Sequence, residues 1–331
     1  MTANTIGIDI GTGKTVFIGR SGEILLNEPT LAAVNPLNGE LIAAGEEAKE
    51  LCGSICSELR LISPVKNGAV CDFEIMRLML KRFIQKALRG KISFFAPKAV
   101  VSLPYGMNDV QAGETLEVLR SAGIRDCKIL SRPLASAIGA GVETSSSSGS
   151  MVIDIGAGLC EVCAICMGRI VSCETVLNAG DKFDASISSK IAAKFGIKAG
   201  KFSCEAIKRS LNECETVHVC GRNLNTGLPS VINIPSKELI KALDDDIKQI
   251  VLVVKHILGE LPSALAGDIL KNGITLCGGA ANTVGLKEAL FEQLGCKTQA
   301  AENAELSAAN GLSKYIDKKI AETSVIKETT A

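Results

Sequence analysis

The feature that most constrains this chain is a five-residue pattern that occurs twice. Asp9-Ile-Gly-Thr-Gly13 and Asp154-Ile-Gly-Ala-Gly158 each follow a short apolar run, and the second aspartate follows the first by 145 residues. A repeat at the spacing of one domain indicates that a single α/β unit has been duplicated. The 331 residues have room for two such units of about 150 residues each.

Each copy of the pattern lies in the same local context, between short β-rich runs that alternate with turn signals. The runs are Thr5–Ile10, Lys14–Gly19 and Glu23–Asn27 in the first half, and Met151–Ile155, Leu159–Cys166 and Ile170–Leu177 in the second. We therefore expect a β-meander to open each half. Ser145–Ser148 between the halves has the composition of a flexible connector.

Apolar spacing predicts the remaining elements. Asp72 and Ser236 can cap two of the helices, and the polar tail beyond Ala321 is expected to be loose. The expected helices are 73–88, 110–122, 134–141, 181–195, 201–211 and 236–258; the expected strands are 98–103, 128–130, 216–222, 228–234 and 273–277.

Composition excludes several classes of protein. Basic and acidic residues are equal at 36 each, so no global field favours nucleic acid. The apolar stretch Met151–Val171 is interrupted by charges and glycines that a membrane-spanning helix would not tolerate. The 13 cysteines are scattered through apolar runs, and the N-terminus does not read as a secretory signal, so we expect a reducing cytoplasm.

Cys160-Glu-Val-Cys163 has the spacing of a zinc or redox pair. Alternation along a strand places the two thiols on opposite faces, however, which favours plain packing over a metal site.

The two glycine hairpins carry the chemistry. Glycines at a strand end let backbone N–H groups approach a phosphate closely, and Asp9 and Asp154 could hold magnesium through its water shell. Taken alone, either hairpin reads better as an ordinary turn capped by its aspartate. Two copies at domain spacing, with a third glycine turn at Gly278-Gly279, favour a phosphate clamp.

Several stretches, in this order, carry a resemblance that covers nearly the whole chain. They are Gly7-Ile-Asp-Ile-Gly-Thr12, Leu26-Asn-Glu-Pro29, Ala44-Gly-Glu-Glu-Ala-Lys49, Ala137-Ile-Gly-Ala-Gly141, Gly149-Ser-Met-Val-Ile-Asp-Ile-Gly156, Ala179-Gly-Asp181, Gly221-Arg-Asn-Leu-Asn-Thr-Gly-Leu-Pro229 and Leu276-Cys-Gly-Gly-Ala280. The chain resembles the MreB family of bacterial actin homologues.

The resemblance implies an α/β, actin-like (ribonuclease H-like) fold of two duplicated lobes around a nucleotide cleft, each with a large and a small subdomain. The first lobe would span residues 1–148, with its small subdomain at about 31–67. The second would span 149–331, with its small subdomain at about 182–250, a C-terminal segment that packs back on the first lobe, and the loose tail at 321–331.

The resemblance also implies ATP and Mg as ligands, with Asp9 and Asp154 as the metal residues. The nucleotide-binding positions that match the family are Gly11, Thr12, Gly13, Lys14, Thr15, Gly156, Ala157, Gly158, Gly180, Asp181, Glu205, Lys208, Gly278, Gly279 and Ala280. Glu205 and Lys208 would flank the ribose and adenine, although their spacing also suits a solvated helix face.

Several positions depart from the family pattern, and they make enzyme activity uncertain. Relatives usually carry Glu-Glu-Pro where this chain has Ser131-Arg132-Pro133, and a threonine pair where it has Leu159-Cys160. Losing groups that orient the attacking water is expected to slow ATP hydrolysis by about 10²-fold or more. Arg132 could instead stabilise charge on the terminal phosphate, or turn to solvent or a surface acid. Lys14, where relatives have asparagine, should favour retention of a triphosphate.

The resemblance further implies filaments that act in cell-shape determination, at the inner face of the cytoplasmic membrane, with cell-wall or cell-shape machinery as partners. Ile92, Phe94 and Phe95 lie where relatives carry a hydrophobic loop and could enter the lipid headgroup region. The alternative is that both phenylalanines pack under the first lobe.

Other functions of the same fold fit less well. A heat-shock chaperone would need a substrate-binding domain after its ATPase, whereas this sequence stops at Ala331. A sugar kinase would need a catalytic aspartate that we cannot assign. A non-polymerising nucleotide-dependent adaptor remains the alternative to a filament protein.

Overall fold

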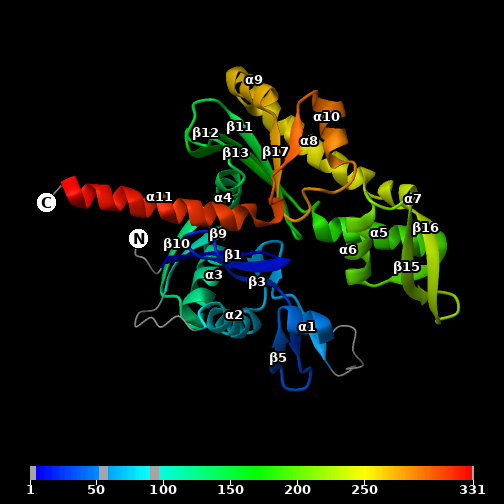
Figure 1. Cartoon of the computed structure of the whole chain (residues 1–331). Helices are drawn as coiled ribbons and strands as arrows, with labels where there is room; N and C mark the ends of the chain where they lie inside the picture. The colour runs from blue at the N-terminus through cyan, green and yellow to red at the C-terminus, as the bar shows by residue number, and fades with distance from the viewer. Residues whose placement is uncertain (1–4, 52–58, 90–96, 330–331) are drawn as a thin grey trace. The chain divides into compact units, whose positions relative to one another are not determined.

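The computed structural model describes residues 5–51, 59–89 and 97–329, with side chains to residue 320. The chain divides into two compact units. Unit 1 comprises residues 1–144 with 302–331, and unit 2 comprises residues 145–301. Each unit is built on a five-stranded sheet with helices packed on it (Figure 1).

The sheet of unit 1 has the strand order β10-β9-β1-β2-β3. Its strands are β1 (Thr5–Ile10), β2 (Lys14–Ile18), β3 (Ile24–Pro29), β9 (Lys98–Leu103) and β10 (Asp126–Ser131). The first three form the predicted meander, while β9 runs parallel to both β1 and β10.

Both faces of this sheet are covered. Ile8, Phe17 and Val101 pack with residues of α2 (Phe73–Ala87) and α3 (Asp109–Ala122). Their strand neighbours point the other way, because side chains alternate along a strand, and pack with α4 (Arg132–Gly139) and α11 (Ser307–Thr329). The predicted cap is confirmed, since the Asp72 carboxylate accepts a hydrogen bond from Ile75 N at 3.1 Å.

Glycines let α4 and α11 cross closely. A Cβ on Gly139 would lie 1.8 Å from Ser307 O, and one on Gly311 would lie 1.7 Å from Ala135 O. α11 continues to Thr329, so the described part of the tail beyond Ala321 is helical. Once the start of a helix is held by packing, each further residue adds a hydrogen bond without a new nucleation cost.

A smaller sheet of order β5-β4-β6 extends unit 1. It contains β4 (Ala32–Val34), β5 (Leu41–Ala44) and β6 (Arg60–Ile62), with α1 (Glu46–Glu50) beside it. A short hairpin of β7 (Val65–Lys66) and β8 (Ala69–Val70) follows.

Unit 2 repeats the connectivity of unit 1, with the strand order β13-β12-β11-β17-β18. The strands are β11 (Ser150–Ile155), β12 (Cys160–Cys166), β13 (Arg169–Val176), β17 (Ile274–Cys277) and β18 (Thr298–Ala300). Again the first three form an antiparallel meander and the last two run parallel to the first. α8 (Asp244–Glu260) packs on β12 and β13, α9 (Ser263–Asn272) packs on β11, and α10 (Leu286–Leu294) packs on α8 and β18.

The rest of unit 2 joins helices to a three-stranded sheet of order β14-β15-β16. These elements are α5 (Gly180–Phe195), β14 (Ile197–Ala199), α6 (Lys201–Ser210), β15 (Thr216–Asn223), β16 (Pro229–Pro235) and α7 (Ser236–Ile240).

The single helix predicted over 236–258 is instead two helices, α7 and α8. Ser236 does not cap, because its hydroxyl donates to Cys214 O at 2.5 Å. α8 begins at Asp244, Asp245 and Asp246, and acidic residues stabilise the positive end of a helix.

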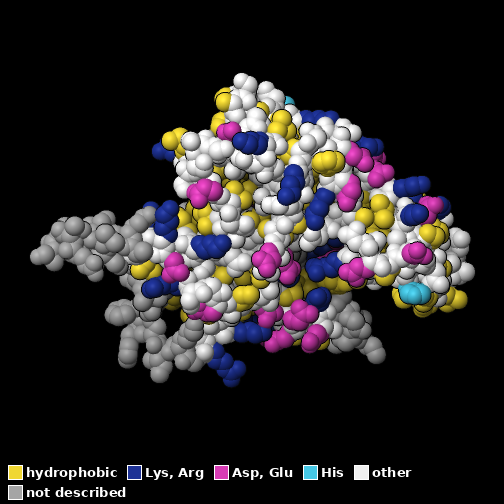
Figure 2. Space-filling model, turned by 45° about the horizontal axis from the view of Figure 1, so that its top comes forward, with side chains coloured by type: hydrophobic (Ala, Val, Ile, Leu, Met, Phe, Trp, Pro, Cys, Tyr) yellow, Lys and Arg dark blue, Asp and Glu magenta, His cyan; other side chains and the backbone are white. Residues whose placement is uncertain are grey.

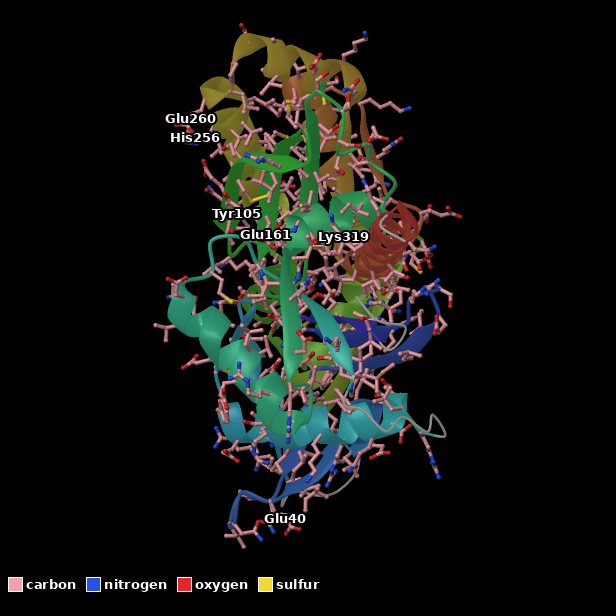
Figure 3. All side chains as sticks on the ribbon, turned by 90° about the vertical axis from the view of Figure 1, so that its left-hand side faces the viewer. Glu40, Tyr105, Glu161, His256, Glu260 and Lys319 are labelled. Atoms are coloured by element: carbon pink, nitrogen blue, oxygen red, sulfur yellow. A yellow bond between two sulfur atoms is a disulfide. The ribbon has the colours of Figure 1, made fainter. Side chains whose placement is uncertain are left out.

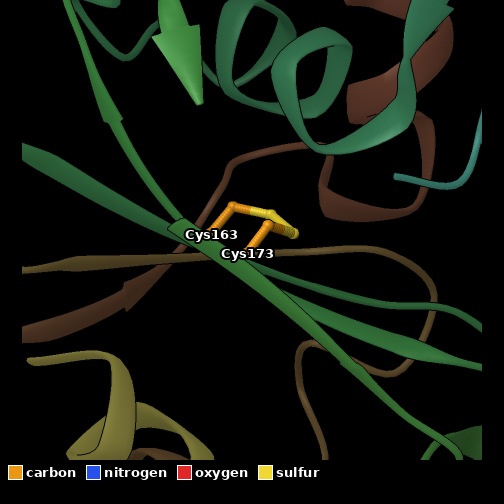
Figure 4. The surroundings of a disulfide bond; sticks show 2 residues. All are labelled: Cys163 and Cys173. Carbon is orange, nitrogen blue, oxygen red and sulfur yellow. A yellow bond between two sulfur atoms is a disulfide. The ribbon is translucent and has the colours of Figure 1, made fainter. Parts of the chain in front are cut away.

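Cys163 and Cys173 form a disulfide between β12 and β13 (Figure 4). The prediction of plain packing for Cys163 is therefore wrong. A register shift between Ala164 and Ile165 is the reason, because it brings Cys163 opposite Cys173. Cys160 remains a free, fully buried thiol.

Candidate phosphate-binding hairpins

The two glycine hairpins have the same backbone geometry. In unit 1, Gly11 N donates to Lys14 O at 2.9 Å; in unit 2, Gly156 N donates to Leu159 O at 2.9 Å. The strand register is the same as well, with Ile10 opposite Thr15 and Ile155 opposite Cys160. The duplication inferred from the sequence thus extends to individual hydrogen bonds.

Carbonyl groups of the first hairpin bond to Thr30. The Thr30 hydroxyl donates to Gly11 O at 2.8 Å, and Thr30 N donates to Gly13 O at 3.0 Å. In a trans peptide, the N–H of the next residue points opposite to the carbonyl. The N–H groups of Thr12 and Lys14 therefore point away from Thr30, as a phosphate-binding loop requires.

The second hairpin meets the N-terminus of α5 in the same way. Gly180 N donates to Gly156 O at 3.0 Å, and Asp181 N donates to Ala157 O at 2.7 Å. The N–H groups of Ala157 and Gly158 consequently point away from the helix. Glycine favours this close approach, since a Cβ on Gly180 would make tight contacts of 3.3 Å with both Ala157 Cα and Gly156 O.

The glycine turn after β17 joins the same region of unit 2. Ala280 N donates to Ile155 O at 2.9 Å, which docks the turn on the end of β11. Gly278 has φ +87°, and a Cβ there would lie 2.3 Å from Ile155 O and 2.6 Å from Asp154 Oδ1. Only glycine fits this position. Gly279, by contrast, has open space around it.

α6 contributes Lys208 to this region. Its ammonium lies 2.8 Å from Asp184 Oδ1 and donates to Gly180 O at 3.0 Å, so it holds the start of α5. Burial raises the pKa of Asp184, and Lys208 opposes that shift. Glu205 pairs with Arg209 at 3.0 Å, and its side chain is 37% exposed. Lys208 thus belongs to a buried ion pair rather than a solvated helix face.

Side chains of the first hairpin are held within unit 1. The Thr12 hydroxyl accepts from Gly68 N at 3.0 Å, and the buried Thr15 hydroxyl lies 3.0 Å from that of Thr30. Lys14 pairs with Glu305 at 3.1 Å.

Arg132 is buried and pairs with Asp9. Its Nε donates to Asp9 Oδ1 at 3.2 Å, and its Nη2 donates to the carbonyl of Ile10 at 2.6 Å. The Ser102 hydroxyl also donates to Asp9 Oδ1. The alternatives that turned Arg132 to solvent or to a surface acid are wrong, because its partner is the half-buried carboxylate of the hairpin itself.

The two aspartates differ in how well they fit a magnesium ion. Magnesium keeps several waters and reaches carboxylates through them, so its site needs room and net negative charge. Asp154 offers the carboxylate oxygens that magnesium prefers, and it is buried against the glycine turn, where a Cβ on Gly278 would lie 2.6 Å from its Oδ1. Asp9 does not fit a magnesium ion, because an arginine already neutralises its charge.

The side chains that replace the family's threonine pair are buried. Leu159 is 5% exposed and Cys160 is fully buried. Burial raises the pKa of the Cys160 thiol well above its usual value, with a further contribution from Asp154. Cys160 is therefore a neutral thiol at physiological pH.

Elsewhere on unit 2, His256 lies between two carboxylates on the surface. Nδ1 is 2.5 Å from Glu174 Oε1 and Nε2 is 3.5 Å from Glu260 Oε1, and Figure 3 labels His256 and Glu260 next to each other on α8. The hydrogen bond that His256 donates to the Glu174 carboxylate raises the pKa of His256. Across the surface drawn in Figure 2, basic and acidic side chains are interspersed.

The segment predicted to contact the membrane, with Ile92, Phe94 and Phe95, lies outside the described residues. Among the described helices, none is long and apolar enough to cross a bilayer.

The strand order and paired hairpins of the two units define the class of actin-like proteins. Solved structures agree. MreB5 of Spiroplasma citri bound to AMPPNP superposes with a TM-score of 0.90 at 27% identity, covering 98% of each chain. A MamK double helical filament subunit has a TM-score of 0.80 at 18% identity, over 94% of this chain and 98% of that one, which supports the fold alone.

Within this class, the chain belongs to the MreB/Mbl protein family, whose pattern matches residues 3–324. It is 34% identical over 323 residues to the cell shape-determining protein Mbl of Bacillus subtilis, covering 96% of this chain and 97% of that protein. It is 32% identical over 327 residues to MreB of Escherichia coli K12, covering 96% and 94%. The predicted family and fold class are confirmed.

Proposed function

We propose that this chain is an ATP-binding, filament-forming cytoskeletal protein that acts in cell-shape determination. One observation carries the nucleotide part. In unit 2 the hairpin at Gly156, the start of α5 and the turn at Gly278 are joined by hydrogen bonds around Ile155 and Gly156. Three backbone segments that meet with glycine at each contact favour a phosphate-binding site.

The relatives support the same proposal. MreB5 of Spiroplasma citri has been solved with AMPPNP and with ADP, at 27% and 26% identity to this chain. We infer that the hairpin N–H groups bind phosphates and that Gly279, Ala280, Glu205 and Lys208 adjoin the nucleoside. Lys208 would act mainly by holding α5, since its ammonium already bonds to Asp184 and Gly180 O.

Asp154 is the residue that would hold magnesium. The ion, when bound, would supply charge neutralisation to the phosphates. The buried carboxylate of Asp154 would orient the water shell of the ion.

We propose that ATP hydrolysis is slow. Arg132 carries donors only and cannot accept a proton from an attacking water. Leu159 and Cys160 are buried and offer no hydroxyl. Phosphate release per subunit measures this, and an Arg132→Glu/Leu159→Thr/Cys160→Thr variant should gain turnover. Wild-type turnover equal to that of active relatives would contradict slow hydrolysis.

Assembly and membrane contact are proposed from the family. Self-association is expected to be head to tail, because a contact between two different surfaces propagates into a filament. We propose that Ile92, Phe94 and Phe95 attach such filaments to the inner face of the membrane, where many weak contacts add up. Liposome co-sedimentation of a Phe94→Ser/Phe95→Ser variant tests this part. Persistent monomers with ATP and lipid, by electron microscopy, would favour the adaptor function instead.

The decisive experiment for nucleotide binding is a calorimetric titration with ATP and magnesium. Gly278→Ala should weaken binding by about tenfold or more, because a side chain there meets Asp154 Oδ1 and Ile155 O and the backbone is left-handed. Gly295→Ala is the matched control, since its backbone is also left-handed, with φ +65°, and nothing lies within 4 Å of a Cβ there. Affinity unchanged in Gly278→Ala, with the fold intact, would contradict the assignment of this site.

A further inference from the structure

The feature that remains unexplained is a permanent positive charge beside the first hairpin. Arg132 and Asp9 have side chains only 9% and 15% exposed. A guanidinium stays protonated at every physiological pH. Asp9 therefore keeps a counter-ion that no change of pH or metal concentration removes.

The Arg132 side chain contacts both the Asp9 carboxylate and the backbone of the first hairpin. Nε bonds to the Asp9 carboxylate, and Nη2 bonds to the carbonyl of Ile10, the last residue before the glycines of the hairpin. Arg132 itself is the first residue of α4, and Pro133 follows it. Proline in the first turn fixes the backbone of the helix start, so the guanidinium is held on a rigid element.

Charge around this hairpin is already balanced. Arg132 compensates Asp9, and Lys14 compensates Glu305, so these two ion pairs sum to zero. A carboxylate next to an arginine attracts a divalent cation far less than an isolated one, because the cation meets the positive charge at nearly the same distance. An incoming phosphate would meet Arg132 rather than an uncompensated aspartate.

We propose that Arg132 is a built-in counter-ion that withholds Asp9 from metal coordination. This inference rests on the proposed binding of ATP. Its consequence is that ATP binding by this chain depends on magnesium through unit 2 and Asp154, with little contribution from unit 1. Arg132 acts here as a positioning residue, through Asp9 and the Ile10 carbonyl.

The test compares the Kd for ATP in excess EDTA with the Kd in magnesium, by calorimetry, in the full chain. Arg132→Met removes the charge but keeps an unbranched side chain for packing, and Arg132→Glu reverses the charge. Both variants should raise the ratio of the Kd in EDTA to the Kd in magnesium by about tenfold or more over wild type. This is the scale on which one adjacent charge changes the affinity of a carboxylate for a cation. Arg132→Lys keeps the charge and should retain most of the wild-type behaviour.

Arg125→Glu is the control for net charge. Arg125 is exposed, between α3 and β10, and its reversal should leave the ratio unchanged. A second readout needs no nucleotide. In a Mn²⁺ titration followed by electron paramagnetic resonance, Arg132→Met should bind Mn²⁺ about tenfold more tightly than wild type. Circular dichroism confirms that each variant is folded. If Arg132→Met does not fold, Arg132→Lys is compared with wild type instead.

The outcomes separate the two proposals. Equal Kd ratios and equal Mn²⁺ affinities in wild type, Arg132→Met and Arg132→Glu would overturn the counter-ion role while leaving ATP binding intact. If no variant binds ATP in either condition, the proposed nucleotide function fails, and the Mn²⁺ comparison alone decides the role of Arg132.

Discussion

Units 1 and 2 carry the same hairpin on the same strand order, yet the aspartate that precedes it has different neighbours in each. On the adjacent parallel strand, Asp9 lies beside Ser102 and Asp154 lies beside Cys277. Arg132 neutralises Asp9, whereas Asp154 borders the glycine turn at Gly278.

The comparison teaches that duplication preserves backbone geometry more strictly than it preserves charge. Hairpin hydrogen bonds and register depend on glycine positions and strand pairing, which the two repeats share. The charge at each aspartate depends on one or two side chains from other elements. A single arginine, Arg132, gives the aspartate of the first hairpin a cationic partner.

The largest expected effect is loss of the buried pair in unit 1. Asp9→Ala should lower the free energy of unfolding by about 3 kcal/mol, because it leaves the Arg132 charge buried without that carboxylate. Urea denaturation measures it. The double variant Asp9→Ala/Arg132→Met should recover most of the loss. If the double variant is as unstable as the single one, the pair is not the cause.

The disulfide lies at a position of unit 2 where the described part of unit 1 has no equivalent, since the residue that corresponds to Cys163 is the buried Ile18. Cys163 and Cys173 are separated by 10 residues, and closing a loop of that size stabilises a fold by about 2–3 kcal/mol. Cys173→Ser should show this loss under oxidising conditions only. Thiol labelling with mass spectrometry provides the control, and two free thiols in non-reduced protein would contradict the bond.

The crossing of α4 and α11 is specific to unit 1. Gly311→Ala should destabilise the protein by about 1–3 kcal/mol, because the new methyl group would meet the Ala135 carbonyl. Gly259→Ala in α8 of unit 2 is the matched control, since nothing lies within 4 Å of its Cβ. That change should raise stability by about 0.5–1 kcal/mol. Thermal unfolding of both variants gives the comparison, and a neutral Gly311→Ala would show that the helices move apart freely.

The smallest effect concerns pH. Both histidines of the chain, His218 and His256, belong to unit 2. Glu174 and Glu260 raise the pKa of His256 in the folded state above 6.5. The protonated histidine therefore stabilises the fold fully below its unfolded-state pKa, and this stabilisation is lost as pH rises through the folded-state pKa. His256→Gln should therefore remove a small fall in Tm as pH rises above 6.5. His218→Gln is the control, and an unchanged pH profile in His256→Gln would sink the assignment.

Much of the fold was predictable because local signals agree with tertiary packing. The helix at Phe73 begins at its predicted cap, and the strands flanking both hairpins lie within two residues of their expected bounds. Glycine pairs and alternating apolar runs favour a local structure over a few residues, so their effect depends little on distant parts of the chain. The sequence did contain a signal for the start of α8, namely three successive aspartates from Asp244. The continuous apolar periodicity across this stretch favoured a single helix instead.

Other features had no local signal. Arg132 meets Asp9 across 123 residues of sequence, and neither residue predicts the other. Cys163 meets Cys173 only because the strand register shifts by one residue at Ala164. Lys208 joined a buried ion pair because α6 packs on α5, and the spacing of Glu205 and Lys208 alone equally suits a solvated surface.

By itself, the sequence determined the duplication, the position of both hairpins, most element boundaries and the family, because each depends on residue types at fixed short spacings. The tertiary structure was needed to show that Asp9 pairs with Arg132 and that Asp154 packs against the glycine turn at Gly278. Ion pairing and burial depend on distances between side chains that are remote along the chain, and packing sets those distances. The same sequence motif therefore has two chemical environments, and Arg132 is the residue that separates them.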